Sequence, residues 1–271
     1  FRPGVMARLG LDPEELVDAH PGLIVASITG FGQEGSWRER PGHDLGYVAL
    51  SGLLAMGARE GQIPAPLSAQ FADIGGGSLT AALSIVAVLL EREKTGKGCW
   101  LDVSMSQGAL AFALPWLGGA LAEGRGPRAD EHPLGGALPQ YRCYRCADGR
   151  VLSVAALEPK FLIDLCGRLG CDIPSSEREW EGLFATRTRE VWLEMLSGCC
   201  VSPVLELQEV PDHPVHRESG SIRTLGGTPK IVPPVGSATD FVGEPAPDLG
   251  QHTVRELAAV GVDWPAGSGE T

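Results

Sequence analysis

The chain is organised around one stretch, which opens GHDLGY at residues 42–47 and closes FADIGGG at residues 71–77. Asp73 stands directly before the apolar run 79–90, which predicts a long helix. A carboxylate there accepts hydrogen bonds from the free N–H groups of the first helical turn, so one interpretation of Asp73 is a helix cap. The glycine triplet 75–77 favours another, because glycines in a first turn leave the backbone open to an anionic or enolate-like ligand.

Apolar segments of strand and helix length alternate over the first part of the chain. Strands are predicted at residues 23–28 and 100–104, and helices at 13–20, 47–56, 79–94 and 107–121. This alternation is typical of a parallel sheet with crossover helices, so the fold class is α/β. The glycine-rich loop 29–35 follows the first strand, at the sheet edge where such folds bind ligands. Its spacing is not that of a dinucleotide site.

The second part of the chain has a different pattern. Glycine, proline and charge dominate residues 122–139, which predicts a linker. Strands at 140–145 and 151–156 flank Ala147-Asp148-Gly149, a hairpin signal. Further segments are predicted in this order: helices at 159–169 and 188–196, a short helix within 200–209, a strand within 217–227, a proline-rich tail at 228–250 and a helix at 252–260. The predicted domains are therefore a large domain at 1–121, the linker, a small α+β domain at 140–227 and a C-terminal tail at 228–271.

Composition excludes several classes of partner. The net charge of -12 argues against a nucleic-acid partner. The longest apolar run, 79–90, is too short to span a membrane, so no membrane partner is expected. Seven cysteines are an odd number and lack the spacing of a secreted scaffold, which predicts reduced thiols and a cytoplasmic location. The single C-x-x-C at 143–146 falls in a predicted strand, where positions three apart face opposite sides, so no metal site is predicted.

Three residues are candidates for acid and base catalysis: His43, Asp73 and Glu158. Histidine is the side chain best matched to proton transfer near neutral pH, although His43 can also be a loop histidine bonded to Asp44. Glu158 ends an apolar strand just before a helix, where a carboxylate also stabilises the helix start. The sequence has no G-x-S-x-G, P-loop or H-E-x-x-H pattern, so serine hydrolase, NTPase and metalloprotease are set aside.

Taken together, several segments resemble the class III CoA-transferase family, and most of all its α-methylacyl-CoA racemase branch. The segments that carry the resemblance are FRPGV at 1–5, TGFGQEG at 29–35, GHDLGY at 42–47, ADIGGG at 72–77, LDVSM at 101–105, ADG at 147–149, ALEPKF at 156–161, VSPV at 201–204 and DHP at 212–214. They agree in order and spacing over essentially the whole chain.

The resemblance implies a Rossmann-like large domain, a smaller α+β domain and two subunits interlocked as a homodimer. It also implies that the family's N-terminal part is missing from this chain. Coenzyme A then enters as part of an acyl-CoA thioester substrate, and no tightly bound cofactor is expected. Arg2 is expected to contact a CoA phosphate, and Asp44 and Tyr47 to line the CoA channel.

The family divides in its chemistry. In its transferases the residue matching Asp73 is a nucleophile that ends as an aspartyl-CoA thioester. In its racemases the same aspartate and a histidine matching His43 exchange the α-proton, and a glutamate matching Glu158 supports the histidine. N–H groups at the start of the Asp73 helix could stabilise the enolate between the two bases. Racemases of the family hold the aspartate with an asparagine four residues earlier. That position is Ala69 here, and Ser68 and Gln70 are the candidates to replace the asparagine.

The features at His43 and Glu158 favour the racemase branch, which implies epimerisation of 2-methylacyl-CoA thioesters by two-base α-proton transfer. Two alternatives stay open. One is a CoA-transferase that moves CoA between an acyl-CoA and a carboxylic acid through the aspartyl-CoA intermediate. The other is a non-catalytic or degenerate fragment that binds acyl-CoA.

Overall fold

The computed structural model describes residues 1–225, 228–231 and 247–263. The chain divides into two compact units, Phe1–Pro203 and Val204–Thr271, and each is described by itself. Within the first unit, two separate clusters of buried side chains lie on either side of residues 122–139 in the sequence. The predicted boundaries of a large domain, a linker, a small domain and a tail stay a prediction.

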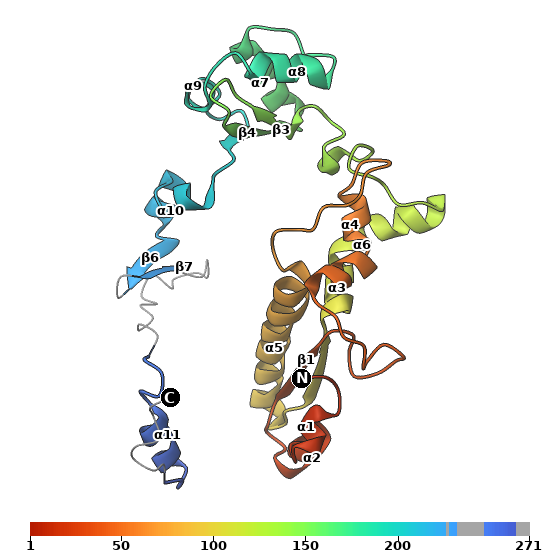
Figure 1. Ribbon diagram of the computed structural model, residues 1–271, viewed down its shortest axis with the longest axis vertical. Coiled ribbons are helices and arrows are strands. Elements are labelled where there is room, and N and C mark those ends of the chain that lie inside the picture. Colours follow the sequence, from red (N-terminus) through yellow and green to blue (C-terminus); the bar gives the residue numbers. More distant parts are fainter. Residues whose placement is uncertain (226–227, 232–246, 264–271) are drawn as a thin grey trace. The chain divides into compact units, whose positions relative to one another are not determined.

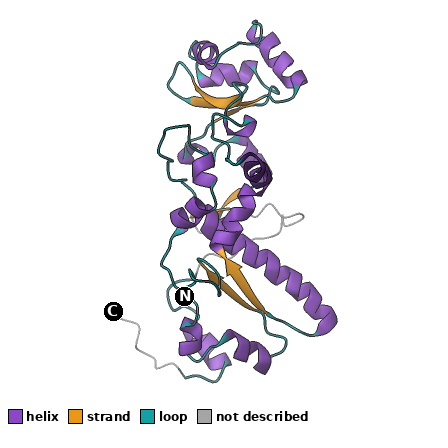
Figure 2. Ribbon diagram, turned by 90° about the vertical axis from the view of Figure 1, so that its right-hand side faces the viewer, coloured by secondary structure: helices purple, strands orange, loops and turns teal. Residues whose placement is uncertain are grey.

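A parallel pair of strands organises the first part of the chain, β1 (Val25–Thr29) and β2 (Trp100–Ser104). Val25 pairs with Trp100 and Thr29 with Ser104, so the two carboxyl ends meet at one edge. The chain between them forms α3 (Asp44–Leu50), α4 (Leu53–Met56), the π-helix η1 (Phe71–Leu79) and α5 (Thr80–Thr95). Two short helices precede β1, α1 (Val5–Arg8) and α2 (Pro13–Ala19), and α5 runs beside the strands (Figures 1 and 2). The predicted α/β fold with a parallel sheet is confirmed.

The long helix differs from its prediction. The sequence predicts a start at residue 79, but η1 and α5 form one continuous helix, Phe71–Thr95, with Asp73 in its first turn. Asp73 is therefore a helical residue, and the interpretation of its side chain as the helix cap is wrong. The first part has the wider turns of a π-helix, which occur frequently at functional sites. Its end is held by the hydroxyl of Ser78, which donates to the Asp73 carbonyl at 3.0 Å.

The glycine triplet serves close packing. Helix α6 (Met105–Glu123) crosses η1, and a Cβ on Gly76 would lie 2.7 Å from the Met105 carbonyl oxygen and 2.8 Å from the Ala109 nitrogen. Gly108 of α6 meets the backbone of Gly76 in return. Gly76 and Gly77 are buried, so they are not open to a ligand. The interpretation of an exposed backbone is therefore wrong at Gly76 and Gly77, and at Gly76 the backbone of another helix fills that space.

The helix Phe71–Thr95 is long and apolar enough to cross a membrane by length and composition alone, with a mean hydropathy of 1.7 in its most apolar window. This corrects the expectation that no run of this chain approaches that length. The sequence run 79–90 is short, but η1 adds an apolar segment to its start. One such helix is weak support for a membrane partner, because the core helix of a soluble protein has the same length and composition.

Residues 141–203 form an antiparallel sheet covered by helices. Strand β3 (Tyr141–Arg145) pairs with β4 (Val151–Ala155), which also pairs with β5 (Val201–Pro203). The predicted hairpin is confirmed. Between β4 and β5 the chain forms α7 (Pro159–Leu169), α8 (Glu177–Phe184) and α9 (Arg189–Met195), and the 3₁₀ turn η2 (Pro133–Gly135) precedes β3. The core of this part holds the aromatic side chains of Tyr144, Trp180, Phe184 and Trp192.

Two details of this part differ from the prediction. Helix α8 is absent from the sequence-based assignment, although Ser176 and Glu179 carry the S-x-x-E signal of a helix start. The Ser176 hydroxyl accepts the Glu179 N–H, as that signal predicts. The predicted short helix within 200–209 is replaced by strand β5 and the 3₁₀ turn η3 (Leu207–Glu209). The β-branched Val201 pairs with Val154, and the sheet therefore extends to these residues.

The second unit, described by itself, contains η3, the helix α10 (Pro214–Ser219), an antiparallel strand pair and the helix α11 (Thr253–Ala259). The strands are β6 (Ile222–Leu225) and β7 (Thr228–Ile231). The predicted strand within 217–227 and the predicted final helix are confirmed, whereas α10 is new. Most of the predicted proline-rich tail lies outside the described residues.

Candidate active site

The segment GHDLGY turns the chain from the loop after β1 into α3. His43 occupies the position before the helix, in an extended conformation, and its side chain is exposed. The ring of Tyr47 lies against Gly42, where a Cβ would come within 2.6 Å of it. Tyr47 is 4% exposed and packs edge-on to Phe31. The buried tyrosine therefore fixes the backbone that presents His43 at the surface.

Asp44 connects α3 to the helix that carries Asp73. Its Oδ1 accepts the N–H of Ala72 at 2.7 Å and the N–H of Asp73 at 2.9 Å. These two bonds join positions 28 and 29 residues apart in the sequence. They bring the first turn of η1 beside the first turn of α3, and therefore bring Asp73 beside His43.

The charges around Asp73 reflect this arrangement. Burial raises the pKa of the half-buried Asp73 carboxyl, the negative charge of Asp44 raises it further, and His43 lowers it. The pKa of Tyr47 is also raised, first by burial and then by the charge of Asp73. Three of the residues that the sequence singles out, His43, Asp44 and Asp73, thus lie within electrostatic reach of one another, and Tyr47 lies beside them.

The expected donors for an enolate are already used. The N–H groups of Ala72 and Asp73 donate to Asp44, so these two groups at the start of the Asp73 helix are not free for a ligand. Gln70 precedes the helix but its side chain forms no cap bond. Among the described residues, neither Ser68 nor Gln70 bonds to the Asp73 carboxylate as a substitute for the asparagine. Asp44 holds Asp73 through its backbone instead.

The structure shows no bond between Glu158 and this group among the described residues. Glu158 precedes α7 in an extended conformation, its side chain makes no cap hydrogen bond, and it is exposed. Among the described residues it forms no hydrogen bond or ion pair with His43 or Asp73. The predicted support of His43 by Glu158 therefore stays a prediction.

Arg2 lies on a cleft of about 400 Å³ beside the two parallel strands. Residues of α1, α2 and β1 line this cleft, together with Gln33 and Trp100. Gln33 belongs to the loop after β1 and is held by Asp102, whose Oδ2 accepts its N–H at 2.9 Å. The cleft therefore reaches the carboxyl ends of the strands, the usual edge for ligands of parallel sheets.

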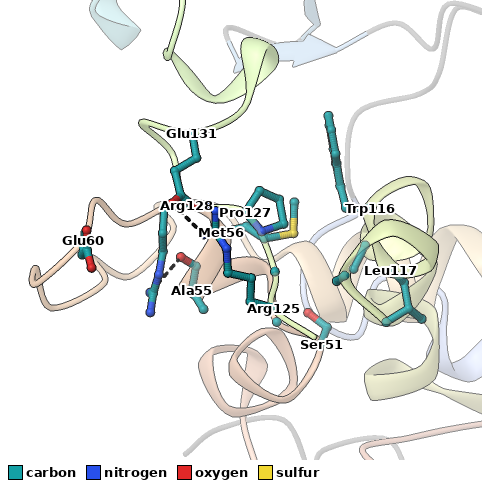
Figure 3. A pocket seen from close by; sticks show the side chains of 14 residues that line it. Ser51, Ala55, Met56, Glu60, Trp116, Leu117, Arg125, Pro127, Arg128 and Glu131 are labelled. Carbon is teal, nitrogen blue, oxygen red and sulfur yellow. Dashed lines mark hydrogen bonds and ion pairs between the residues drawn. The ribbon is translucent and has the colours of Figure 1, made fainter. Parts of the chain in front are cut away.

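A second cavity, of about 430 Å³, was not expected from the sequence. It lies between α4, α6 and residues 125–131, with Trp116 and Leu117 on one side and Arg128 and Glu131 on the other (Figure 3). Arg125 donates to Glu131 at 2.7 Å, and Arg128 donates to the Ala55 carbonyl at 3.4 Å. These interactions hold the charged groups at the rim, so the free wall of the cavity is mainly apolar.

In the described part of the chain, no group of three or more histidine, cysteine, aspartate or glutamate side chains is placed so that it could hold a metal ion. The seven cysteines are free thiols. Cys143 is exposed and Cys146 is buried, as expected for positions that face opposite sides.

A family model described as CoA-transferase family III matches residues 1–253. The chain belongs to CoA-transferase family III. It is 36% identical to the α-methylacyl-CoA racemase of Mus musculus over 96% of this chain and 73% of that protein. It is 39% identical to the Homo sapiens enzyme of the same name, over 83% of this chain and 62% of that protein. Proteins named as CoA-transferases also match.

The fold agrees with a solved structure of the same family. A CaiB/BaiF family protein from Brucella suis superposes with a TM-score of 0.82, covering 96% of this chain and 74% of that one, at 24% identity. The mixed α/β fold of this family III chain is thereby shown. Its relatives are isomerases and transferases that act on CoA thioesters, so CoA as part of the substrate fits the family.

Proposed function

We propose that this family III protein epimerises 2-methylacyl-CoA thioesters by moving the α-proton between His43 and Asp73. The observation that carries the proposal is the pair of hydrogen bonds from Ala72 and Asp73 to Asp44, which places the start of the Asp73 helix beside His43. Inversion of a carbon acid needs a base on one face and an acid on the other. A histidine directly before α3 and an aspartate in the first turn of η1, neither of them fully buried, suit that task.

The chemistry follows from the two groups. In one direction the neutral His43 imidazole takes the α-proton, and the C–H electron pair moves into the thioester carbonyl to form an enolate. The Asp73 carboxylic acid then gives its proton to the opposite face of that carbon. In the other direction the roles reverse. Burial and the Asp44 charge raise the pKa of Asp73, which favours the acid form that gives the proton, although His43 acts in the opposite direction.

The apolar cavity supports a fatty acyl chain as the substrate class. Helix α3 begins next to His43 and ends at Leu50, directly before Ser51, which lines the cavity. Seven residues of α-helix span about 10 Å, so the cavity begins about that far from the proposed base. Met56, Trp116 and Leu117 offer an apolar wall to a hydrocarbon chain. The Arg2 cleft, on the other hand, offers a guanidinium for a CoA phosphate.

Three further parts belong to the proposal. Glu158 supports the imidazole of His43, and two copies of the chain form an interlocked homodimer. Tyr47 lies next to the CoA channel and packs the backbone of Gly42. The protein works in the cytoplasm with reduced thiols, a proposal that rests on the number and spacing of its cysteines.

The test is α-proton exchange without an acceptor acid. The protein is incubated with a 2-methylacyl-CoA in D₂O, and deuterium at the α-carbon is followed by mass spectrometry. We expect exchange in the wild type and its loss in His43→Ala. The proposal is overturned if no exchange occurs and CoA instead passes to an added free acid, with a trappable adduct on Asp73.

That second outcome is the CoA-transferase alternative. The carboxyl of Asp73 is half-buried and free of side-chain bonds among the described residues, as a nucleophile would need to be. Relatives named as CoA-transferases match the chain, for example one from Acetobacter aceti at 40% identity over 49% of this chain. His43→Ala would then leave most of the activity, whereas Asp73→Ala would remove it. Binding of acyl-CoA with neither reaction would leave the non-catalytic alternative.

A further inference from the structure

The side chain of Asp44 acts as a helix cap at a distance. In an ordinary helix start, the cap residue directly before the helix accepts the N–H of the second or third helical residue. In η1 these residues are Ala72 and Asp73, and both N–H groups donate to Oδ1 of Asp44, from another helix. Gln70 holds the usual cap position but makes no such bond. Asp44 therefore replaces the missing local cap.

A carboxylate is well suited to this position. The N-terminus of a helix carries a partial positive charge, and a charged acceptor binds N–H groups more strongly than a neutral one. The bonds are part-buried and short, at 2.7 and 2.9 Å. Loss of Asp44 would leave two part-buried N–H groups without a partner and would loosen the turn that carries the Asp73 carboxyl.

We propose that Asp44 is the positioning residue for Asp73, because its two bonds to the N–H groups of Ala72 and Asp73 fix the first turn of η1 against α3. The role rests on the proposed function in so far as Asp73 is the reacting acid. It differs from the expectation that Asp44 lines the CoA channel, because its Oδ1 is engaged by two N–H groups. A free carboxylate there would also repel CoA phosphates.

The surroundings of Asp73 leave few other groups for this electrostatic role. Asp44 and His43 act on its pKa in opposite directions, and Tyr47 faces it as a buried neutral phenol. Helix α6, which crosses η1, carries one charged residue, Glu123, at its far end, and β1 carries none. Asp102 of β2 bonds to the N–H of Gln33, and the charged residues of α5 begin at Glu91 in its last turns.

Two variants separate the hydrogen bonds from the charge. Asp44→Asn keeps a carbonyl oxygen for the two N–H groups but removes the negative charge, whereas Asp44→Ala removes both. Amide hydrogen exchange of Ala72 and Asp73 is measured in each, with the thermal midpoint as the control for folding. We expect protection of these amides to be largely kept in Asp44→Asn and lost in Asp44→Ala. Equal protection in the wild type and Asp44→Ala would overturn the cap.

The pH dependence of kcat/KM for α-proton exchange tests the effect of the Asp44 charge. In the active enzyme, His43 and Asp73 share one proton. The acid limb of the pH profile therefore follows the loss of the second proton from this pair, and that ionisation belongs mainly to Asp73. Because the Asp44 charge raises the pKa of Asp73, Asp44→Asn should move this limb to lower pH. We expect Asp44→Ala to lower kcat by about tenfold or more, since small misplacements of a reacting group are costly. An unmoved limb, or a large rise in KM with kcat unchanged, would overturn the proposal and favour a CoA contact.

A direct titration separates this proposal from the proposed function. The ¹³C NMR signal of the Asp73 carboxyl is assigned with Asp73→Asn and titrated in the wild type and in Asp44→Asn, without substrate. A lower Asp73 pKa in Asp44→Asn supports the positioning role even if the wild type shows no α-proton exchange, which would sink only the racemase reaction. The same pKa in both proteins overturns the positioning role even if exchange is seen.

Discussion

The two buried clusters of the first unit are built on different principles. In residues 141–203, a three-stranded sheet and three helices enclose Trp180, Phe184, Leu152 and Leu165, which are fully buried. Around the candidate site, the buried cluster found among the described residues is small: Tyr47, Val48, Ala72 and Ala109. The helix beside them leaves large side chains in the open, with Leu83 72% and Leu90 63% exposed.

The difference teaches that stability and chemistry lie in separate parts of this unit. The part at 141–203 supplies a complete core by burial of aromatic and aliphatic side chains. The part that carries His43 and Asp73 is held by close backbone packing at Gly76 and by the carboxylate of Asp44.

The largest expected effect is on the reaction. Asp73→Ala should reduce α-proton exchange by about 10²- to 10⁴-fold, the usual contribution of a positioned acid or base. The thermal midpoint should stay near the wild-type value, because alanine suits a helix and no side-chain bond of Asp73 is lost within the described residues. Rates from mass spectrometry and midpoints from circular dichroism check both parts.

Asp148→Ala is the control from the other part. Its carboxylate accepts the N–H groups of Arg150 and Arg189, both at 3.2 Å, so its loss should lower stability by about 1–3 kcal/mol. Its exchange rate should change little. The comparison fails if Asp73→Ala unfolds the protein or if Asp148→Ala abolishes exchange.

A matched pair of leucines sharpens the contrast in burial. Leu165→Ala, at a side chain with 0% exposure, should lower the free energy of unfolding by about 2–5 kcal/mol. Leu83→Ala, at 72% exposure, should change it by less than about 0.5 kcal/mol. Urea unfolding monitored by fluorescence measures both. A loss at Leu83 as large as that at Leu165 would show that the apolar face of α5 is covered in solution.

A matched pair of glycines tests the packing of η1 against α6. Gly76→Ala would force a Cβ against the backbone of Met105 and Ala109 and should cost about 1–3 kcal/mol. Gly118→Ala lies within α6, where a Cβ meets nothing within 4 Å, and should be neutral or stabilising by up to about 1 kcal/mol. Thermal unfolding compares the two. Equal midpoints would contradict the close approach of the helices.

The last prediction concerns the stability of the protein at alkaline pH. Burial is the main cause that raises the pKa of the Cys146 and Cys199 thiols from 9.0 to about 11. A raised pKa in the folded state means that stability is complete below about pH 9 and falls as the pH rises toward about 11, because the unfolded chain releases these protons first. Urea titrations across this range measure the fall. Cys199→Ala should reduce it, and an unchanged slope in that variant would contradict the assignment.

Much of the fold follows from local sequence. The alternation of 100–104 and 107–121 predicts β2 and α6, and the turn at Ala147-Asp148-Gly149 predicts the hairpin of β3 and β4. The start of η1 does not follow, because its cap comes from Asp44 and not from an adjacent residue. The role of the glycine triplet is also not predictable from the sequence. Glycines allow close approach both to a ligand and to a neighbouring helix, so the same sequence fits either role.

Part of the candidate site can be predicted from the sequence. His43, Asp44, Tyr47 and Asp73 are all named from sequence, and the structure brings them together. Periodicity alone cannot show that two segments about thirty residues apart meet, since that contact depends on one carboxylate and two backbone N–H groups. The cavity beside Trp116 has no sequence signal, because its lining comes from three separate segments.

The most direct test of the central claim follows each epimer separately. The pure 2R and 2S forms of a 2-methylacyl-CoA are converted in D₂O, and the product epimer and the remaining substrate are analysed for deuterium at early times. Two bases on opposite faces predict that the product epimer carries solvent deuterium while the remaining substrate still largely holds its original proton. Product without deuterium, or no interconversion of the epimers, would contradict the assignment of His43 and Asp73 as a two-base pair.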